Sequence, residues 1–160
     1  MDKHTATIEW KREPDAQFLR GRYSRAHHWR FDGGAMVRGS SSPHVVRPPF
    51  SDPAAVDPEE AFIAALSSCH MLWFLSIAMK EGFVVDSYVD HAEGLMEGDI
   101  DTGAEITVVT LRPRVRFSGA KSPDDAAVKH LHHQAHELCF IARSVKTRIV
   151  EEGTWEHAAT

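Results

Sequence analysis

The sequence predicts an α+β fold formed by a single domain over residues 1–160, with antiparallel strands and two helices in separate stretches of the chain. Two observations carry this prediction. Short segments that interleave β-branched and aromatic residues with polar ones lie on both sides of one long apolar segment, and turn or helix-start residues separate them. The resulting order of strands, helix, hairpin, helix and strand lacks the regular alternation typical of a parallel α/β sheet.

The amino-terminal segments predict an antiparallel meander. Residues 5–12 and 27–32 have the composition of strands, and the Asp-Gly-Gly sequence at 32–34 is typical of a hairpin turn. Residues 39–57 then contain four prolines and three consecutive serines, which exclude a helix or a central strand. We expect a long ordered loop there, of the kind that is usually functional.

A long helix is predicted from Pro58 to about Glu81. Asp57 has the residue type of an N-cap, Pro58 occupies the first helical position, and Glu60 completes a pattern like a capping box. Gly82 is expected to end this helix.

A β-hairpin is predicted next, with strands at residues 83–97 and 105–118 around a turn-rich segment at 98–103. Polar and apolar residues alternate over most of the second strand, which gives it one face for the core and one for solvent.

The last elements are a second helix and a short strand. Ser122, Pro123 and Asp125 repeat the helix-start pattern, and the helix is expected to reach the neighbourhood of Cys139. Residues 148–152 are predicted to form a closing strand.

Composition excludes several classes of function. The 18 Lys and Arg residues and 23 Asp and Glu residues give a formal charge of −5, so the chain lacks the basic face that phosphate backbones require, and we expect no nucleic-acid partner. No glycine-rich phosphate loop is present. The sequence therefore predicts no nucleotide cofactor.

The chain is expected to be cytoplasmic. Its first fifteen residues, MDKHTATIEWKREPD, are polar where a signal peptide needs an apolar core. Residues 61–79 are nearly long enough to cross a bilayer at ~1.5 Å per residue. Their Ser-Ser-Cys-His centre is a poor lipid-facing surface, however, and a helix that is apolar on all sides is equally typical of a soluble core. We therefore expect a core helix and no membrane association.

Two cysteines, Cys69 and Cys139, are too few for a disulfide scaffold and do not form a CxxC pair. Each alone is most simply a buried structural residue. Cys139 lies close in sequence to Arg143, Lys146 and Arg148, which would lower its pKa if they faced it.

Histidines near the second cysteine suggest another chemistry. His132, His136 and Cys139 have i, i+4, i+7 spacing, and His133 and His136 also share a helical face. Such donors can bind zinc or nickel. A solvated histidine-rich face is the commoner explanation, so metal binding stays an alternative.

Two motifs resemble a known family. Residues 57–70, DPEEAFIAALSSCH, resemble the central-helix motif of the osmotically inducible protein C and organic hydroperoxide resistance (OsmC/Ohr) superfamily, and residues 135–139, AHELC, resemble its second cysteine landmark. The resemblance implies an OsmC-like fold of antiparallel sheets with a long central helix, assembled as an intertwined homodimer. Phe140 stands where members often have proline, and the meander lacks the Gly-Gly-Arg loop of the hydroperoxide resistance branch. The chain therefore resembles an OsmC-like member more than either well-characterised branch.

The resemblance implies a thiol-dependent peroxidase that reduces organic hydroperoxides, alkyl or lipid. Cys69 would be the peroxidatic thiol and Cys139 the resolving thiol, and turnover would form a Cys69–Cys139 disulfide. A dithiol such as a lipoylated protein would reduce that disulfide. Five residues are expected to form an apolar wall for the substrate: Phe62, Leu66, Leu72, Trp73 and Phe140. A non-catalytic binding member of the fold is the other alternative.

An apolar wall disfavours a thiolate, so an opposing cation is needed. The resemblance implies an arginine from the amino-terminal meander and a glutamate from the start of the long helix. Glu59 matches the glutamate by its place in the PEE motif. Arg25 is the best match for the arginine, and its rivals are Arg22, Arg30 and Arg38.

Helix geometry then predicts a dimer. Glu59 and Cys69 are ten residues apart, which on one helix separates them by ~15 Å along the axis and ~80° around it. If both serve one site, two copies of the long helix pack antiparallel, with Glu59 of one chain near Cys69 of the other. The competing possibility is that the helix is buried within one chain and Glu59 only favours the helix dipole.

Overall fold

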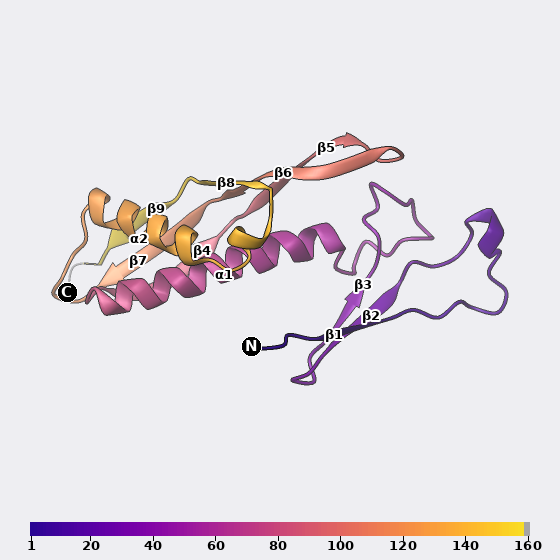
Figure 1. The fold of residues 1–160 in the computed structure, drawn as a ribbon, viewed down its shortest axis with the longest axis horizontal. Coiled ribbons are helices and arrows are strands. Elements are labelled where there is room, and N and C mark those ends of the chain that lie inside the picture. The colour runs from indigo at the N-terminus through magenta and orange to yellow at the C-terminus, as the bar shows by residue number, and fades with distance from the viewer. Residues whose placement is uncertain (159–160) are drawn as a thin grey trace. The chain divides into compact units, whose positions relative to one another are not determined.

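The structure is a computed structural model that describes residues 1–158. Its contacts divide the chain into two compact units, Met1–Ala61 and Phe62–Thr160 (Figure 1). Each unit is described by itself.

The first unit contains the predicted antiparallel meander. Strands β1 (Ala6–Glu9), β2 (His27–Phe31) and β3 (Met36–Gly39) form a sheet in the order β1-β2-β3. A short 3₁₀ helix, η1 (Phe18–Arg20), lies in the connection between β1 and β2. The β2–β3 turn falls at the predicted Asp-Gly-Gly segment.

The loop that follows β3 is held by backbone hydrogen bonds, as expected of an ordered loop. The N–H of Ser40 donates to the carbonyl of Val56 at 3.0 Å, and the N–H of Val56 donates to the carbonyl of Arg38 at 3.0 Å. The end of the loop thus lies beside the end of β3 and leads directly into the long helix.

Helix α1 (Pro58–Lys80) begins and ends as predicted. Asp57 Oδ1 accepts from the N–H of Glu60 at 2.8 Å, and Glu60 Oε2 accepts from the N–H of Asp57 at 3.2 Å, which is a complete capping box. At the other end Gly82 has a φ of +80°, the left-handed conformation that glycine adopts at low cost.

The second unit contains two three-stranded mixed sheets. Their orders are β4-β7-β9 and β5-β6-β8, and in each sheet the last pair is parallel and the other antiparallel. The strands are β4 (Val84–Asp90), β5 (Glu93–Asp99), β6 (Gly103–Leu111), β7 (Pro113–Ser118), β8 (Arg148–Glu151) and β9 (Thr154–His157). Strand β8 confirms the predicted closing strand, and β9 was not predicted.

The predicted hairpin exists, but each of its strands is broken into two. β5 pairs with β6 and β4 with β7, so the pairing is that of one long hairpin divided between two sheets. The break lies at Arg112, whose backbone N–H donates to Asp90 Oδ1 at 2.6 Å instead of to a neighbouring strand. Pro113 follows and has no N–H to donate. The prediction of two continuous strands was therefore wrong at this point.

Helix α2 (Asp125–Leu138) starts later than the pattern suggested. Its N-cap is Asp124, whose carboxylate accepts from the N–H of Ala127 at 2.8 Å, while the Ser122 hydroxyl donates to the carbonyl of Pro123 at 3.3 Å. After α2 the chain forms a second 3₁₀ helix, η2 (Ala142–Ser144).

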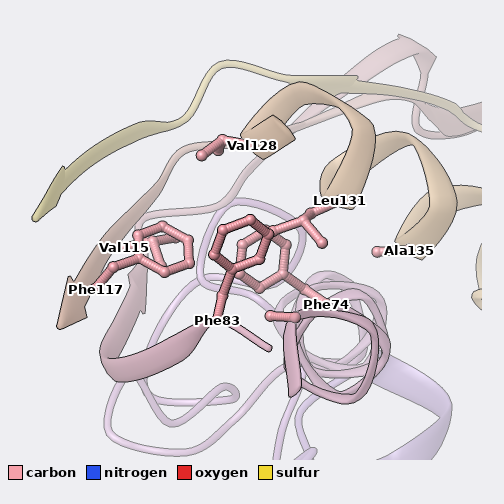
Figure 2. Close-up of a cluster of buried hydrophobic side chains, with 8 residues drawn as sticks. Phe74, Phe83, Val115, Phe117, Val128, Leu131 and Ala135 are labelled. Carbon is pink, nitrogen blue, oxygen red and sulfur yellow. The ribbon is translucent and has the colours of Figure 1, made fainter. Parts of the chain in front are cut away.

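Two apolar clusters form the core of the second unit, and α1 contributes to both. Every fourth residue of α1 is buried: Leu66, His70, Phe74 and Ala78. In the first cluster Phe74 meets side chains of α2 and β7, as Figure 2 shows for Leu131 and Phe117. In the second, Leu66 meets Leu111 of β6. Burial of each such large side chain contributes roughly 1.5–3 kcal/mol.

Helix α1 is also the one helix in the described part of the chain that is long and apolar enough to cross a membrane, with a mean hydropathy of 1.7. The face of α1 that carries Leu66, His70, Phe74 and Ala78 is buried in the protein core. A single helix of this kind is weak evidence for a membrane span, since the core helix of a soluble protein has the same composition.

Candidate functional site

The structure brings Cys69 and Cys139 together. Cys139 is a buried member of the second apolar cluster, Cys69 packs against that cluster, and the two thiols lie close enough for Cys69 to raise the pKa of Cys139. Both are free thiols. They are 70 positions apart in the sequence, and both belong to the second unit. The fold of that unit therefore brings them to the same cluster.

The two cysteines are positioned by different means. Cys69 lies in the middle of α1 and is partly exposed. Cys139 is the C-cap of α2, has extended backbone angles and is fully buried. The Cys139 sulfur accepts a hydrogen bond from the N–H of Ala142 at 3.4 Å, at the start of η2. The position of the second thiol is therefore determined by the end of α2 and by the turn after it.

Burial raises the pKa of the Cys139 thiol to about 11, and the nearby Cys69 thiol acts in the same direction. The Ala142 N–H opposes this shift and is the weaker influence. The condition for a lowered pKa, cations that face the thiol, is not met, since no cation contributes to the shift. Arg143 donates to the carbonyl of Glu137 at 3.4 Å, and Lys146 pairs with Glu105. Cys139 is thus a protonated thiol at neutral pH.

Most of the predicted apolar wall surrounds the dithiol. Leu66 is fully buried beside Cys139, and Phe62 and Trp73 pack against the same cluster. The rings of Trp73 and Phe140 meet edge to face with centroids 5.5 Å apart. Leu72 is 60% exposed and packs in neither cluster, so its assignment to the wall was wrong.

Buried polar side chains that the sequence did not indicate as functional lie on the same helix. Ser67 donates to Asp90 Oδ2 at 2.5 Å, and His70 Nε2 lies 3.0 Å from His132 Nδ1. The only signal in the sequence was the presence of Ser67 and His70 within an otherwise apolar helix. Nothing local identified Asp90 or His132 as their partners.

The alternative metal site is not formed. His132 is 5% exposed and its ring lies nearly parallel to that of His70, with centroids 5.3 Å apart. Helix α2 ends before Cys139, so the i+7 position no longer shares its face. Within residues 1–158 no group of three His, Cys, Asp or Glu side chains has a geometry that could hold a metal ion.

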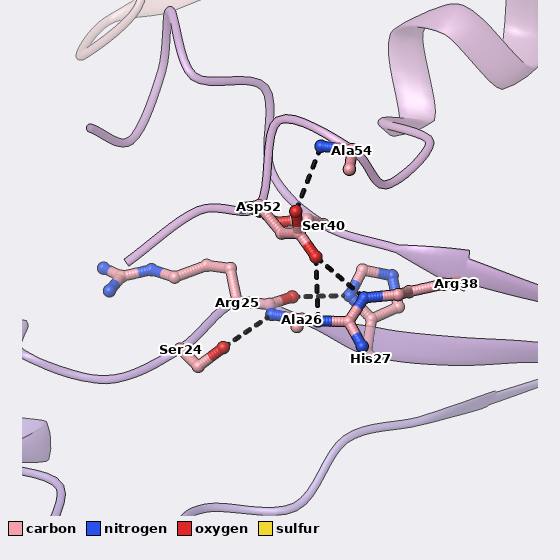
Figure 3. Close-up of polar contacts among 8 residues, drawn as sticks. All are labelled: Ser24, Arg25, Ala26, His27, Arg38, Ser40, Asp52 and Ala54. Carbon is pink, nitrogen blue, oxygen red and sulfur yellow. Dashed lines mark hydrogen bonds and ion pairs between the residues drawn. The ribbon is translucent and has the colours of Figure 1, made fainter. Parts of the chain in front are cut away.

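In the first unit, Arg25 is held by its own segment. One guanidinium nitrogen, Nη1, donates to the carbonyls of Gly21 at 2.8 Å and Tyr23 at 2.6 Å, and the group lies 3.7 Å above the Tyr23 ring. Figure 3 shows its side chain extending away from the Arg38–Asp52 pair.

The rival arginines differ in their partners. Arg30 pairs with Glu9 at 2.8 Å, and Arg38 pairs with Asp52 at 2.7 Å. Among the described residues, neither Arg22 nor Arg25 has an ion-pair partner. The two arginines with carboxylate partners are the less available for another role.

Arg25 also lines an open pocket of about 400 Å³ in the first unit. Three aromatic rings form much of its wall, with the Phe18 and Tyr23 centroids 4.6 Å apart and the Trp10 and Tyr23 centroids 5.6 Å apart. The pocket has the mixed apolar and cationic lining that suits an amphiphilic ligand.

Glu59 lies in the first turn of α1. Its Oε2 atom is buried and has no hydrogen-bond partner among the described residues. Burial is the main cause that raises the pKa of Glu59, and the neighbouring carboxyl groups of Asp57 and Glu60 add to it. No ion pair between Glu59 and Arg25 is formed within residues 1–158. Both residues belong to the first unit, whereas the cysteines belong to the second.

Comparison with known proteins finds one family and several similar structures. A family model described as OsmC-like protein matches residues 51–152. An OsmC-like protein of unknown function from Vibrio cholerae is 51% identical, with a TM-score of 0.92 over 96% of this chain and 100% of that chain. A search of curated proteins found no match.

More distant structures share the fold. An organic hydroperoxide resistance protein from Elizabethkingia anophelis has a TM-score of 0.65 at 14% identity, over 99% of this chain and 98% of that chain. The organic hydroperoxide resistance protein OhrB of Bacillus subtilis has a TM-score of 0.58 at 17% identity, over 95% and 98% of the two chains. At these identities the similarity concerns the fold alone.

Proposed function

The chain belongs to the OsmC-like protein family, and from that membership we propose that it reduces organic hydroperoxides through Cys69 and Cys139. One observation carries the proposal: the only two cysteines of the chain, far apart in sequence, lie at the same apolar cluster, where Cys69 packs against the residues that bury Cys139. A pair of structural cysteines has no need to meet.

The exposure of the two thiols assigns their roles. The Cys69 thiolate, partly exposed, attacks the distal oxygen of ROOH, the O–O bond breaks, and the alkoxide takes a proton and leaves as ROH. The Cys69 sulfenic acid then condenses with the fully buried Cys139 thiol, forming the S–S bond and releasing water. No further oxidant is required.

The surroundings of the dithiol favour an organic peroxide over hydrogen peroxide. Phe62, Leu66 and Trp73 offer apolar contacts to an alkyl or lipid chain and few hydrogen-bond partners to a small polar peroxide. Binding of the alkyl group releases water from these surfaces, with a gain of roughly 25 cal/mol per Å² of apolar area buried.

We assign the activating cation to Arg25 and its orientation to Glu59. The buried, unpaired Oε2 of Glu59 needs a donor, and a guanidinium group satisfies a carboxylate well. Arg25 uses only Nη1 in its hydrogen bonds to backbone carbonyls, so its other nitrogens can still donate.

The active form is proposed to be a homodimer. Exposed small residues, Ala64, Ala65 and Ser68, form one side of α1 where a second helix can approach closely. If two copies cross antiparallel at residue 64, residue 59 of one copy lies opposite residue 69 of the other, because both are five residues from the crossing point. The register that buries the small residues thus places Glu59 level with the partner's Cys69 along the helix axis.

Turnover is completed by reduction of the disulfide. A dithiol exchanges with the Cys69–Cys139 disulfide. It gives two electrons and two protons to the protein, is itself oxidised to a disulfide, and leaves both protein thiols reduced. A lipoylated protein in the cytoplasm is the proposed donor, because the apolar surroundings of the cysteines suit a small dithiol on an alkyl arm.

Stopped-flow measurement of reduced protein with cumene hydroperoxide and with H₂O₂ tests the proposal. Consumption of cumene hydroperoxide that is faster than that of H₂O₂ and absent in Cys69→Ser is the expected result. Equal loss of peroxide in wild type and Cys69→Ser would refute the peroxidase function.

A further inference from the structure

A buried pair of histidines joins the two helices that lead to the cysteines. His70 and His132 are 2% and 5% exposed, and their Nε2 and Nδ1 atoms are 3.0 Å apart. His70 directly follows Cys69 on α1, and His132 lies seven residues before Cys139 on the α2 segment. Among the described residues, no other hydrogen bond between side-chain nitrogen or oxygen atoms joins α1 to α2, and the nearest polar contact is that of His130 on α2 with Glu81, one residue past the end of α1, at 3.4 Å.

His132 is held on more than one side. Its ring lies 4.4 Å from that of Phe74, one turn beyond His70 on α1, so it contacts two successive turns of that helix. Its second nitrogen, Nε2, lies 3.7 Å from Glu151 Oε1 on β8. The location of His132 is therefore defined by α1 and by β8 together.

The Glu151 carboxyl group, 3.7 Å from His132 Nε2, favours one direction for the hydrogen bond. A proton on His132 Nε2 faces the Glu151 carboxyl group, which leaves His132 Nδ1 as an acceptor. His70 Nε2 is then the donor. Burial keeps the pKa of both rings below the ordinary value, so this arrangement of two neutral rings is the stable one at neutral pH.

We infer that His70 and His132 are positioning residues for the dithiol, because the hydrogen bond between them fixes α2 along α1 and so sets the separation of the Cys69 and Cys139 sulfur atoms. Their role in turnover rests on the proposed function. Disulfide formation requires an S–S distance of ~2.05 Å and a Cα separation of ~4.4–6.8 Å, so a small slide of one helix prevents it.

Apolar packing does not supply this constraint. The remaining side chains between α1 and α2, among them Phe74, Ala78, Leu131 and Ala135, attract one another without a fixed direction. A hydrogen bond is directional and weakens steeply when its donor moves off line. Because Cys139 is the C-cap of α2, a slide of that helix moves the resolving thiol with it.

The test is the thiol–disulfide equilibrium of the full-length protein with dithiothreitol. Oxidised dithiothreitol takes two electrons and two protons from the protein dithiol, whose two S–H bonds are replaced by one S–S bond. In His70→Gln the amide nitrogen reaches the position of Nε2 and keeps the donor. In His70→Asn the same amide is one methylene shorter and does not reach His132.

We expect the ratio of protein disulfide to dithiol, at a fixed dithiothreitol ratio, to fall about ten-fold in His70→Asn and to change less than about two-fold in His70→Gln. Leu131→Val is the matched control, since it removes buried volume beside His132 without touching the hydrogen bond. It should lower stability and leave the ratio unchanged. If His70→Asn fails to fold, two variants of His132 form the second comparison. His132→Asn keeps an acceptor at the Nδ1 position, and His132→Leu does not.

Equal ratios in wild type and His70→Asn overturn the inference, as does a shift in Leu131→Val as large as that in His70→Asn. Failure of the wild-type protein to form any disulfide overturns it too. The exchange uses no peroxide, so the two proposals fail separately. The expected order of ratios without consumption of cumene hydroperoxide refutes the peroxidase function and upholds the positioning role.

Discussion

Nε2 of His132 lies 3.7 Å from Oε1 of Glu151, and burial disfavours the charged form of both groups. The pKa of His132 is lowered to about 3, mainly by burial and then by His70, whereas burial raises the pKa of Glu151. Burial likewise lowers the pKa of His70 to about 4, with an opposing influence from Asp90 on β4 and a reinforcing one from His136 on α2.

Stability is expected to fall between pH 7 and pH 4. In this range the unfolded chain protonates its histidines near 6.5, while the folded state keeps His70 and His132 neutral until about pH 4 and 3. Unfolding therefore takes up protons, and each histidine lowers the free energy of unfolding by up to ~1.4 kcal/mol per pH unit. The slope should be much smaller in the double variant His70→Leu/His132→Leu, measured by urea unfolding at fixed protein concentration.

The raised pKa of Glu151 acts in the opposite direction, since its folded form binds a proton more readily than its unfolded form. Glu151 is present in both proteins, so comparison of the two slopes isolates the histidines. Parallel stability curves for wild type and the double variant would show that the pair is not neutral in the folded state.

Removal of the resolving thiol should stop the cycle after one turnover. Cys139→Ser keeps Cys69, and one equivalent of cumene hydroperoxide should be consumed with a sulfenic acid left at Cys69. Excess peroxide should then add a second oxygen to the same residue, because no thiol remains to condense with it. Intact-mass spectrometry with trapping of the sulfenic acid is the measurement, and continued turnover by this variant would exclude Cys139 as the resolving thiol.

The rate of disulfide formation should rise with pH well into the alkaline range. The pKa of Cys139 is about 11, so the fraction of its nucleophilic thiolate increases about ten-fold per pH unit below that value. Single-turnover stopped flow that follows tryptophan fluorescence after one equivalent of peroxide measures this step between pH 6 and 9.5. A plateau near neutral pH would mean that the thiol is activated by a group that is not in contact with it in the reduced form.

Replacement of Arg25 should slow the first chemical step. In Arg25→Ala the sulfenic acid at Cys69 is expected to form about ten-fold or more slowly, because the variant lacks the guanidinium group that we propose to donate a charge-assisted hydrogen bond to the reacting thiolate. Arg30→Ala and Arg38→Ala are matched controls, since these arginines already pair with Glu9 and Asp52. Wild-type rates in Arg25→Ala, together with slow rates in Arg22→Ala, would transfer the role to Arg22.

Local features of the fold were predictable from the sequence because they depend on neighbouring residues. Asp57 and Glu60 are three positions apart, and the capping box between them follows from residue type and spacing alone. The pairing of the long hairpin follows from its central turn in the same way. The break at Arg112 does not, because it depends on the side chain of Asp90, 22 residues earlier.

The candidate site was predictable only as far as its motifs. The resemblance of the two cysteine segments indicated that Cys69 and Cys139 belong together, and the structure places both at the second apolar cluster. The resemblance gave no sign of the pair formed by His70 and His132, which are 62 residues apart. The sequence left open whether the cations near Cys139 face it, and the fold buries the thiol while Arg143 and Lys146 have other partners.

The proposed sharing of a site between two chains makes a prediction about mixed dimers. Glu59→Ala chains keep Cys69, and Cys69→Ser chains keep Glu59, so each homodimer has two damaged sites. In the heterodimer one site combines both lesions and the other is intact. Mixing two poorly active proteins should therefore restore up to about half of the wild-type activity per heterodimer, as expected for a symmetric two-site assembly.

The comparison is decisive only if subunits exchange, which native mass spectrometry of the mixture establishes. Ala64→Trp supplies the control, because a large side chain at the proposed crossing point should block helix packing without disturbing the buried face of α1. This variant should sediment as a monomer, lose most of its peroxidase activity and still form the Cys69–Cys139 disulfide with oxidised dithiothreitol, since both cysteines belong to one chain. Confirmed heterodimers without recovered activity would show that Glu59 does not serve the partner's thiol, and a wild-type protein that sediments as a monomer at micromolar concentration would exclude the dimer itself.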